Sequence, residues 1–293
     1  NDQCSALPGV TIDGFIGIPN IRYYFVFLCF IYILSVVGNT LVMIVITLDH
    51  MLRSPKYIAV FNLTFTDLLS SSALVPKVVD IFLFNHYYIS YNDCLTFMFS
   101  ALLYMRCRVM AIMYPLHYQM RVSHKLILSL IAFFWLLAIT LTLIAVGLLT
   151  RLSFCQSVII QSYYCDNGPM YRLGCNDATP NYIFAALAIV LVLGFPLAFI
   201  VGSYCCIVKA FKTCTGHLSL VAIYFLSVIF VYAFGRVIHP NARIINLSIA
   251  TVLPPMLNPI IYVLQTEEIK ESLRRLLKAR VQAKLEVFRF KPL

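Results

Sequence analysis

The chain has 293 residues, of which 61% are hydrophobic and only 12% are charged, with a formal net charge of +10. Soluble domains are closer to half apolar and a quarter charged, so this composition excludes an ordinary soluble domain. A helix needs about 20 apolar residues to cross a hydrocarbon core of about 30 Å, and several runs in this sequence reach that length. The composition therefore predicts a helical protein that crosses a membrane several times.

The expected elements, in chain order, form one domain of residues 1–293. An outer N-terminal segment covers 1–22, and an inner tail covers 265–293. The seven expected membrane spans are about 23–48, 57–84, 95–114, 125–150, 181–208, 217–238 and 243–264. The third span carries two arginines, Arg106 and Arg108, near its inner end. If it failed to cross, six spans would remain and every later segment would change sides.

Lysine and arginine residues indicate the orientation of the chain. With seven spans and the N-terminus outside, sixteen of the 22 basic residues fall on inner segments and six on outer ones. An excess of Lys and Arg on the cytoplasmic side is typical of membrane proteins. We therefore expect the N-terminus outside, the C-terminus in the cytoplasm and the basic surface against anionic membrane lipid, with no nucleic-acid partner.

Cysteines agree with this orientation. Cys94, Cys155, Cys165 and Cys175 fall on expected outer segments, where disulfides persist, and four cysteines allow three pairings. The start of the tail, 267–280, places apolar residues on one helical face and basic residues on the other. This pattern predicts an amphipathic helix on the inner membrane surface, although a solvated surface helix has the same pattern.

Polar residues inside the apolar spans are informative because burying them in lipid is costly. Asn39, Asp67 and Asn258 each lie near the middle of an expected span, and we expect them to face one another and to share water or a cation. Pro259 removes a backbone hydrogen bond and kinks the last span. Such a cluster acts either as glue between helices or as part of a conformational switch.

Short motifs along the chain occur in a fixed order. They are GN at 38–39, LTFTD at 63–67, MAIMYPLHY at 110–118, SY at 203–204, KAFKTCTGHL at 209–218 and PMLNPIIY at 255–262. Together they resemble the signature set of vertebrate odorant receptors, a family of rhodopsin-like G-protein-coupled receptors, and SPKYIAVFNLTFTD resembles its fish-type branch. The resemblance spans nearly the whole chain. It implies an all-α, seven-transmembrane helix bundle with a C-terminal amphipathic helix.

The resemblance also implies roles for individual residues. It pairs Cys94 with Cys165 and Cys155 with Cys175. The residues implied in the activation switch and G-protein coupling are Arg108, Tyr204, His217, Asn258, Pro259 and Tyr262, with Asn39 and Asp67 completing the polar network. The implied ligand wall is Ala185, Ala188, Ile189, Phe225, Val228, Tyr232, Ser248 and Thr251. Such a wall, mostly apolar with a few hydroxyls, suits a small organic ligand, and ordinary helix packing is the alternative for each residue.

Two segments are shorter than the family pattern. Cys94 and Arg108 are fourteen residues apart, or about 21 Å of helix, less than a hydrocarbon core of about 30 Å. In an inserted helix, Arg108 would therefore lie about two turns too deep, unless Arg106 and Arg108 extend toward the inner surface. Cys107 stands where the family has an acid, so Arg108 is expected to lack its resting-state partner. Only twelve residues separate Tyr204 from His217, which shortens the junction of the fifth and sixth spans.

These observations predict an odorant receptor. It would bind a small organic or water-soluble odorant in the outer half of the bundle and activate a heterotrimeric G protein of the olfactory stimulatory type. The expected location is the plasma membrane, in sensory cilia. The alternative is a non-signalling receptor relic, or a mis-predicted or truncated gene product, retained in the endoplasmic reticulum. The sequence has no phosphate loop, catalytic triad or metal-ligand spacing, so neither an enzyme nor a cofactor is expected. It also lacks the inverted repeats typical of transporters.

Overall fold

The computed structural model describes residues 9–15, 17–112, 123–155, 158–194, 226–227, 230 and 238–289. Expected site residues outside this part are Tyr204, His217, Phe225, Val228 and Tyr232. The expected junction of the fifth and sixth spans lies outside it too.

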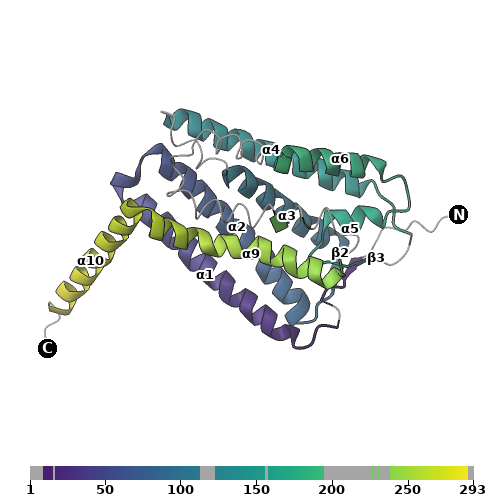
Figure 1. Cartoon of the computed structure of the whole chain (residues 1–293), viewed down its shortest axis with the longest axis horizontal. Coiled ribbons are helices and arrows are strands. Elements are labelled where there is room, and N and C mark those ends of the chain that lie inside the picture. Colours follow the sequence, from purple (N-terminus) through teal and green to yellow (C-terminus); the bar gives the residue numbers. More distant parts are fainter. Residues whose placement is uncertain are drawn as a thin grey trace.

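The described chain is mainly a bundle of long helices (Figure 1). The long helices are α1 (Ile21–Leu48), α2 (Pro55–Leu83), α3 (Tyr91–Ile112), α4 (His124–Thr150), α9 (Pro240–Gln265) and α10 (Glu267–Arg289). The short ones are η1 (His50–Leu52), α5 (Asn167–Arg172), α6 (Thr179–Ile189) and the π-helical η3 (Val190–Gly194), which continues α6. The predicted all-α fold is confirmed.

In the described part of the chain, four helices are long and apolar enough to cross a membrane by length and composition, namely α1, α2, α4 and residues 240–264 of α9. Their outward faces carry large apolar side chains, such as Phe30 on α1 and Leu136 on α4, which are 59% and 65% exposed. In water such a surface would be a large unfavourable apolar patch. In a bilayer it is the surface that lipid chains cover.

A three-stranded sheet covers one end of the bundle, and the sequence analysis did not predict it. The strands are β1 (Gly9–Ile12), β2 (Tyr88–Ser90) and β3 (Val158–Ile160), in the order β2-β1-β3. Strand β1 is antiparallel to β2 and parallel to β3. We call this the sheet end; it also carries α5 and the beginning of the chain (Figure 1).

The N-terminal segment is part of the core at the sheet end. Val10 and Ile12 on β1 have no exposed surface. Phe15 packs edge-on against Phe25 of α1 and Phe82 of α2, with ring centroids 5.4 and 5.2 Å away. Edge-to-face aromatic pairs add to the stabilisation from burial. The residues before α1 therefore close the sheet end.

At the opposite end, which we call the α10 end, the chain leaves the bundle as α10 (Figure 1). Ile269 of α10 is buried in a core cluster with Tyr57 and Tyr262. The charged face of α10 carries ion pairs. Lys56 Nζ lies 2.6 Å from Glu268 Oε1, and Arg275 donates to Asp49 at 3.0 Å. The predicted amphipathic helix is present and is attached to the connection between α1 and α2.

Helix α3 begins earlier than expected. Ser90 ends β2 and caps the helix, since its hydroxyl accepts from Asp93 N at 3.1 Å and donates to Asp93 Oδ2 at 2.7 Å. This cap satisfies one backbone donor in the first turn, the N–H of Asp93. The helix has 22 residues and spans about 33 Å, enough to cross a hydrocarbon core. The early start lengthens the helix but leaves the short distance between Cys94 and Arg108 unchanged.

Candidate functional site: a buried polar centre

Within the described residues, a buried polar centre joins α2, α3 and α9. Arg108 Nε of α3 lies 3.1 Å from Asp67 Oδ1 of α2, and the two side chains are 2% and 0% exposed. Asn258 Nδ2 of α9 donates a hydrogen bond to Asp67 Oδ2. Asp67 lies near the middle of its helix, so the buried ion pair lies at mid-bundle depth.

The expectations for the two arginines need correction. Arg108 does not lack a partner, because Asp67 takes that role although Cys107 offers no carboxylate. The guanidinium groups do not extend to a surface either. Arg106 is 8% exposed and donates to Thr142 Oγ1 of α4 at 2.9 Å. The physical reason is that neighbouring helices supply hydrogen-bond acceptors for both guanidinium groups. These partners replace the water that each charge loses on burial.

Arg108 also connects the centre with α9 and the loop after β3. Its Nη1 donates to the backbone oxygen of Thr251 at 3.0 Å. The hydroxyl of the same threonine lies 3.2 Å from the hydroxyl of Tyr163, a loop residue at the sheet end that is 1% exposed. A continuous line of contacts therefore runs from the sheet end through Thr251 to Arg108 and Asp67.

A second branch connects α1 with the centre. Asn39 Nδ2 donates to the backbone oxygen of Pro255 on α9 at 2.8 Å. Ser35 Oγ of α1 lies 3.3 Å from Ser71 Oγ of α2, which donates to the backbone oxygen of Asp67 at 2.6 Å. Asn39 Nδ2 also donates to Ser35 Oγ at 3.2 Å, so Asn39, Asp67 and Asn258 belong to one hydrogen-bond network. Only Asp67 and Asn258 bond directly.

Close helix packing surrounds the network. A Cβ atom on Gly38 would lie 3.0 Å from Pro259 Cβ, so α1 and α9 touch here through a glycine and a proline. Tyr262, one turn further along α9, is 2% exposed and packs in the core cluster at the α10 end. Asn258, Pro259 and Tyr262 all lie on α9, so a rigid movement of this helix would shift all three.

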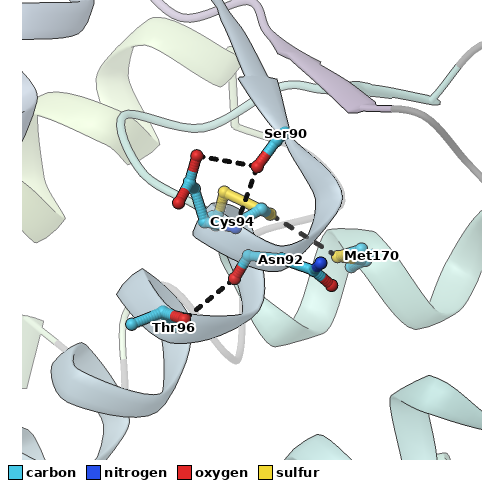
Figure 2. The surroundings of a disulfide bond; sticks show 7 residues. Ser90, Asn92, Cys94, Thr96 and Met170 are labelled. Carbon is cyan, nitrogen blue, oxygen red and sulfur yellow. Dashed lines mark hydrogen bonds between the residues drawn. A yellow bond between two sulfur atoms is a disulfide. The ribbon is translucent and has the colours of Figure 1, made fainter.

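Two disulfides fasten the sheet end. Cys94 of α3 joins Cys165 with Cα atoms 5.5 Å apart, and Cys155 joins Cys175 at 6.1 Å, which are usual spacings. These are the pairs that the resemblance implies. Figure 2 shows Cys94 just after the Ser90 cap, with Met170 of α5 beside its sulfur. The first disulfide therefore holds the loop that carries Tyr163 against α3.

The expected ligand-wall residues lie on two helices in the described part. Ala185, Ala188 and Ile189 lie on α6, where Ala188 is buried and Ala185 packs against the core cluster that includes Tyr163. Ser248 and Thr251 lie on α9, 1% and 7% exposed. The other three are outside the described residues.

Sequence reasoning missed Tyr24 and Tyr163. The Tyr24 hydroxyl of α1 bonds to Ser248 Oγ, and that of Tyr163 bonds to Thr251 Oγ1. The signal for Tyr163 was present, since it stands two residues before the disulfide cysteine Cys165 in a loop that must cover the bundle. Tyr24 gave no signal, because an aromatic residue at the start of an apolar run usually marks a membrane interface.

Comparison with known proteins defines the class of this fold. The structure superposes on the crystal structure of squid rhodopsin with a TM-score of 0.72, covering 96% of this chain and 94% of that chain. At 15% identity this likeness concerns the fold alone, and it shows a rhodopsin-like bundle.

Sequence comparison then gives the family. A family model described as "Olfactory receptor" matches residues 28–280. Olfactory receptor 1 of Rattus norvegicus is 33% identical, covering 90% of this chain and 92% of that protein. Olfactory receptor 1J1 of Homo sapiens is also 33% identical, covering 84% of each. The chain belongs to the olfactory receptor family, and it is therefore a multi-pass membrane receptor and not an enzyme.

Proposed function

We propose that this chain is an odorant receptor. A small organic or water-soluble odorant binds in the half of the bundle near the sheet end, and a heterotrimeric G protein of the olfactory stimulatory type binds at the α10 end. The sheet end faces the outside, and α10 lies on the cytoplasmic surface of the plasma membrane in sensory cilia. The basic residues of α10 fit this orientation, because they would meet anionic lipid headgroups.

The observation that carries the proposal is the line of contacts from Tyr163 through Thr251 to the ion pair of Arg108 and Asp67. It connects a loop at the sheet end with a buried network that reaches Asn258 and, through α9, Tyr262. A receptor needs such a connection, because ligand and G protein bind at opposite ends. Family membership alone would not supply it.

The mechanism is a shift between two arrangements of the helices. A ligand stabilises the arrangement to which it binds more tightly, and the G protein binds the same arrangement. In the resting arrangement the ion pair fixes α2 against α3, while Arg108 and Asn258 fix α9 to both. Ligand binding beside Thr251 would loosen α9, and Pro259, Tyr262, Tyr204 and His217 would transmit the movement. No bond is made or broken in this process.

The test is to express the full chain with an N-terminal tag in cells that contain the olfactory stimulatory G protein. Antibody staining of intact cells measures the orientation and surface display, and cyclic AMP measures signalling during an odorant screen. A receptor shows the tag outside and gives a dose-dependent response to at least one odorant. Retention in the endoplasmic reticulum together with no response would instead support the receptor relic.

A variant separates a true response from a background one. Thr251→Val keeps the shape of the side chain but removes the hydroxyl that bonds to Tyr163, and it is expected to weaken the response. Thr140→Val is the matched control, because Thr140 is exposed on α4 and, within the described part of the chain, its hydroxyl bonds to the backbone oxygen of Leu136 at 2.9 Å. An unchanged response in Thr251→Val would contradict the proposed line of communication.

A further inference from the structure

Two tyrosine hydroxyls reach α9 one helical turn apart. Tyr24 of α1 bonds to Ser248 Oγ, and Tyr163 of the loop after β3 lies 3.2 Å from Thr251 Oγ1. Residues three apart on a helix share a face, so the two pairs are neighbours. They come from elements far apart in the sequence, and they meet in the half of the bundle near the sheet end.

The direction of each hydrogen bond follows from the other bonds of the α9 hydroxyls. Ser248 Oγ donates to the backbone oxygen of Ile245 at 2.9 Å, and Thr251 Oγ1 donates to that of Leu247 at 2.7 Å. A hydroxyl has one hydrogen and two lone pairs, so each α9 hydroxyl has used its only hydrogen. Tyr24 and Tyr163 are therefore the donors. In each of the two pairs, a tyrosine hydroxyl donates and a hydroxyl oxygen of α9 accepts.

The charge at this place is balanced. The charged group that contacts Thr251 is Arg108, through the backbone oxygen, and its charge faces Asp67 3.1 Å away. Ser248, Thr251 and Tyr163 are at most 7% exposed. A charged ligand would bring an uncompensated charge into this buried environment at a high cost. A neutral ligand brings no charge and avoids this cost.

From these observations we infer that the ligand is a small neutral alcohol, which inserts its hydroxyl between a tyrosine donor and its α9 acceptor. This inference rests on the proposed function. The inserted hydroxyl accepts from Tyr163 and donates to Thr251, so that no buried polar group loses its partner. An aldehyde accepts from tyrosine and gives the α9 oxygen no donor. An alkane replaces neither bond. The expected order of affinity is alcohol, then aldehyde, then alkane.

The test is direct binding to the purified full-length receptor in lipid nanodiscs, with hexanol, hexanal and hexane as probes. Dissociation constants come from the dependence of the melting temperature on ligand concentration. Hexanol is expected to bind about three- to tenfold more tightly than hexanal, which is the usual effect of one hydrogen bond, and more tightly still than hexane. Thr251→Val and Tyr163→Phe should each reduce the preference for hexanol over hexane by about three- to tenfold.

Matched controls keep the shape of each change. Thr140→Val makes the same substitution at an exposed hydroxyl on α4, and Tyr87→Phe removes an exposed hydroxyl that bonds to Asn85 Oδ1 at 2.9 Å. Both should preserve the preference. Equal binding of hexanol and hexane, no binding of hexanol, or an unchanged preference in both Thr251→Val and Tyr163→Phe would each overturn the inference.

Failure of the proposed function has a different readout. If hexanol binds with the expected preference but no odorant raises cyclic AMP, the ligand class stands and the signalling role fails. If the receptor responds to other odorants while hexanol does not bind, the signalling role stands and the inferred ligand class is wrong.

Discussion

Arg108 and Asp67 form an ion pair in the middle of the bundle, with Nε and Oδ1 3.1 Å apart and neither side chain more than 2% exposed. Each partner also bonds to α9, Arg108 through the backbone of Thr251 and Asp67 through Asn258. Three helices are therefore joined by two opposite charges. Inside the bundle, each charge is stabilised by its partner instead of by water.

Removing one partner of this pair should be much worse than removing both. Arg108→Gln leaves Asp67 buried without its counter-charge and is expected to lower the free energy of unfolding by about 3–5 kcal/mol. The double variant Asp67→Asn/Arg108→Gln should lose less than the sum of the single losses. Chemical unfolding of the purified receptor in detergent measures both. Arg274→Gln, at an exposed position on α10, is the control. Additive losses would show that the pair has no coupling energy.

The contact of α1 with α9 should tolerate no larger side chain. Gly38→Val would force a branched side chain into space held by Pro259, whose Cβ lies 3.0 Å from the position of an added Cβ. Overpacking of this kind costs about 1–3 kcal/mol. Gly147→Val on α4 is a matched control, because no described atom lies within 4 Å of an added Cβ there. Melting temperatures in detergent compare the two, and an equal decrease would contradict the predicted contact.

Truncation of Phe15 should destabilise the sheet end. Its ring is 5% exposed and contacts Phe25 and Phe82, so Phe15→Ala should cost about 3–5 kcal/mol. Phe30→Ala removes a ring that is 59% exposed on the outer side of α1, and it should have a much smaller effect. The rate of proteolysis near the N-terminus measures local opening. Equal rates in both variants would mean that Phe15 does not hold the segment in place.

Attachment of α10 should depend on pH. The hydrogen bond from Ser272, the backbone N–H of Met51 and the charge of Arg275 lower the pKa of Asp49 below its ordinary value of 3.8. A lowered pKa means that the carboxylate stabilises the folded arrangement above the ordinary value. This contribution is lost as the pH falls through the lowered pKa. We therefore expect α10 to detach progressively in acid below about pH 4.

A fluorophore on Lys278→Cys would report this detachment as a fall in anisotropy, since Lys278 is exposed on α10. In Asp49→Asn the pH dependence should become weaker, with α10 already loosened at neutral pH. The remaining part comes from Glu268 on α10, whose pKa is lowered by its hydrogen bond with Lys56. Asp177→Asn removes another carboxyl of lowered pKa, at the sheet end, and should leave the transition unchanged. An acid transition of unchanged size in Asp49→Asn would assign the effect to other groups.

Much of the bundle could be predicted from the sequence for a simple physical reason. An apolar run of about 20 residues has few alternatives to a membrane helix, so α1, α2 and α4 begin and end within two residues of the expected bounds. The network of Asn39, Asp67 and Asn258 was predictable because isolated polar groups in lipid must find partners.

The remaining features depend on contacts between distant residues. The strands have only three or four residues, and Val10 pairs with Ile89 and Val158, which no local pattern indicates. The partner of Arg108 was missed because family likeness assigned it to the inner end of α3. The disulfide at Cys94 fixes the start of that helix, so a shortened distance to Arg108 places the guanidinium at the depth of Asp67. The hydrogen bonds of Tyr24 and Tyr163 could not be predicted, because composition does not reveal which hydroxyls meet.

The central position of β1 in its sheet has a consequence for biosynthesis. β1 is made first, but its parallel partner β3 follows α4 in the chain. While α1 to α4 enter the membrane, the residues of β1 lack their partner β3. Pairing of β1 with β3 closes the longest loop of the sheet, a slow, entropically costly step. Strand β1 therefore reaches its final pairing only after α1 to α4 have been made, and its burial marks a receptor whose first four long helices are already in place.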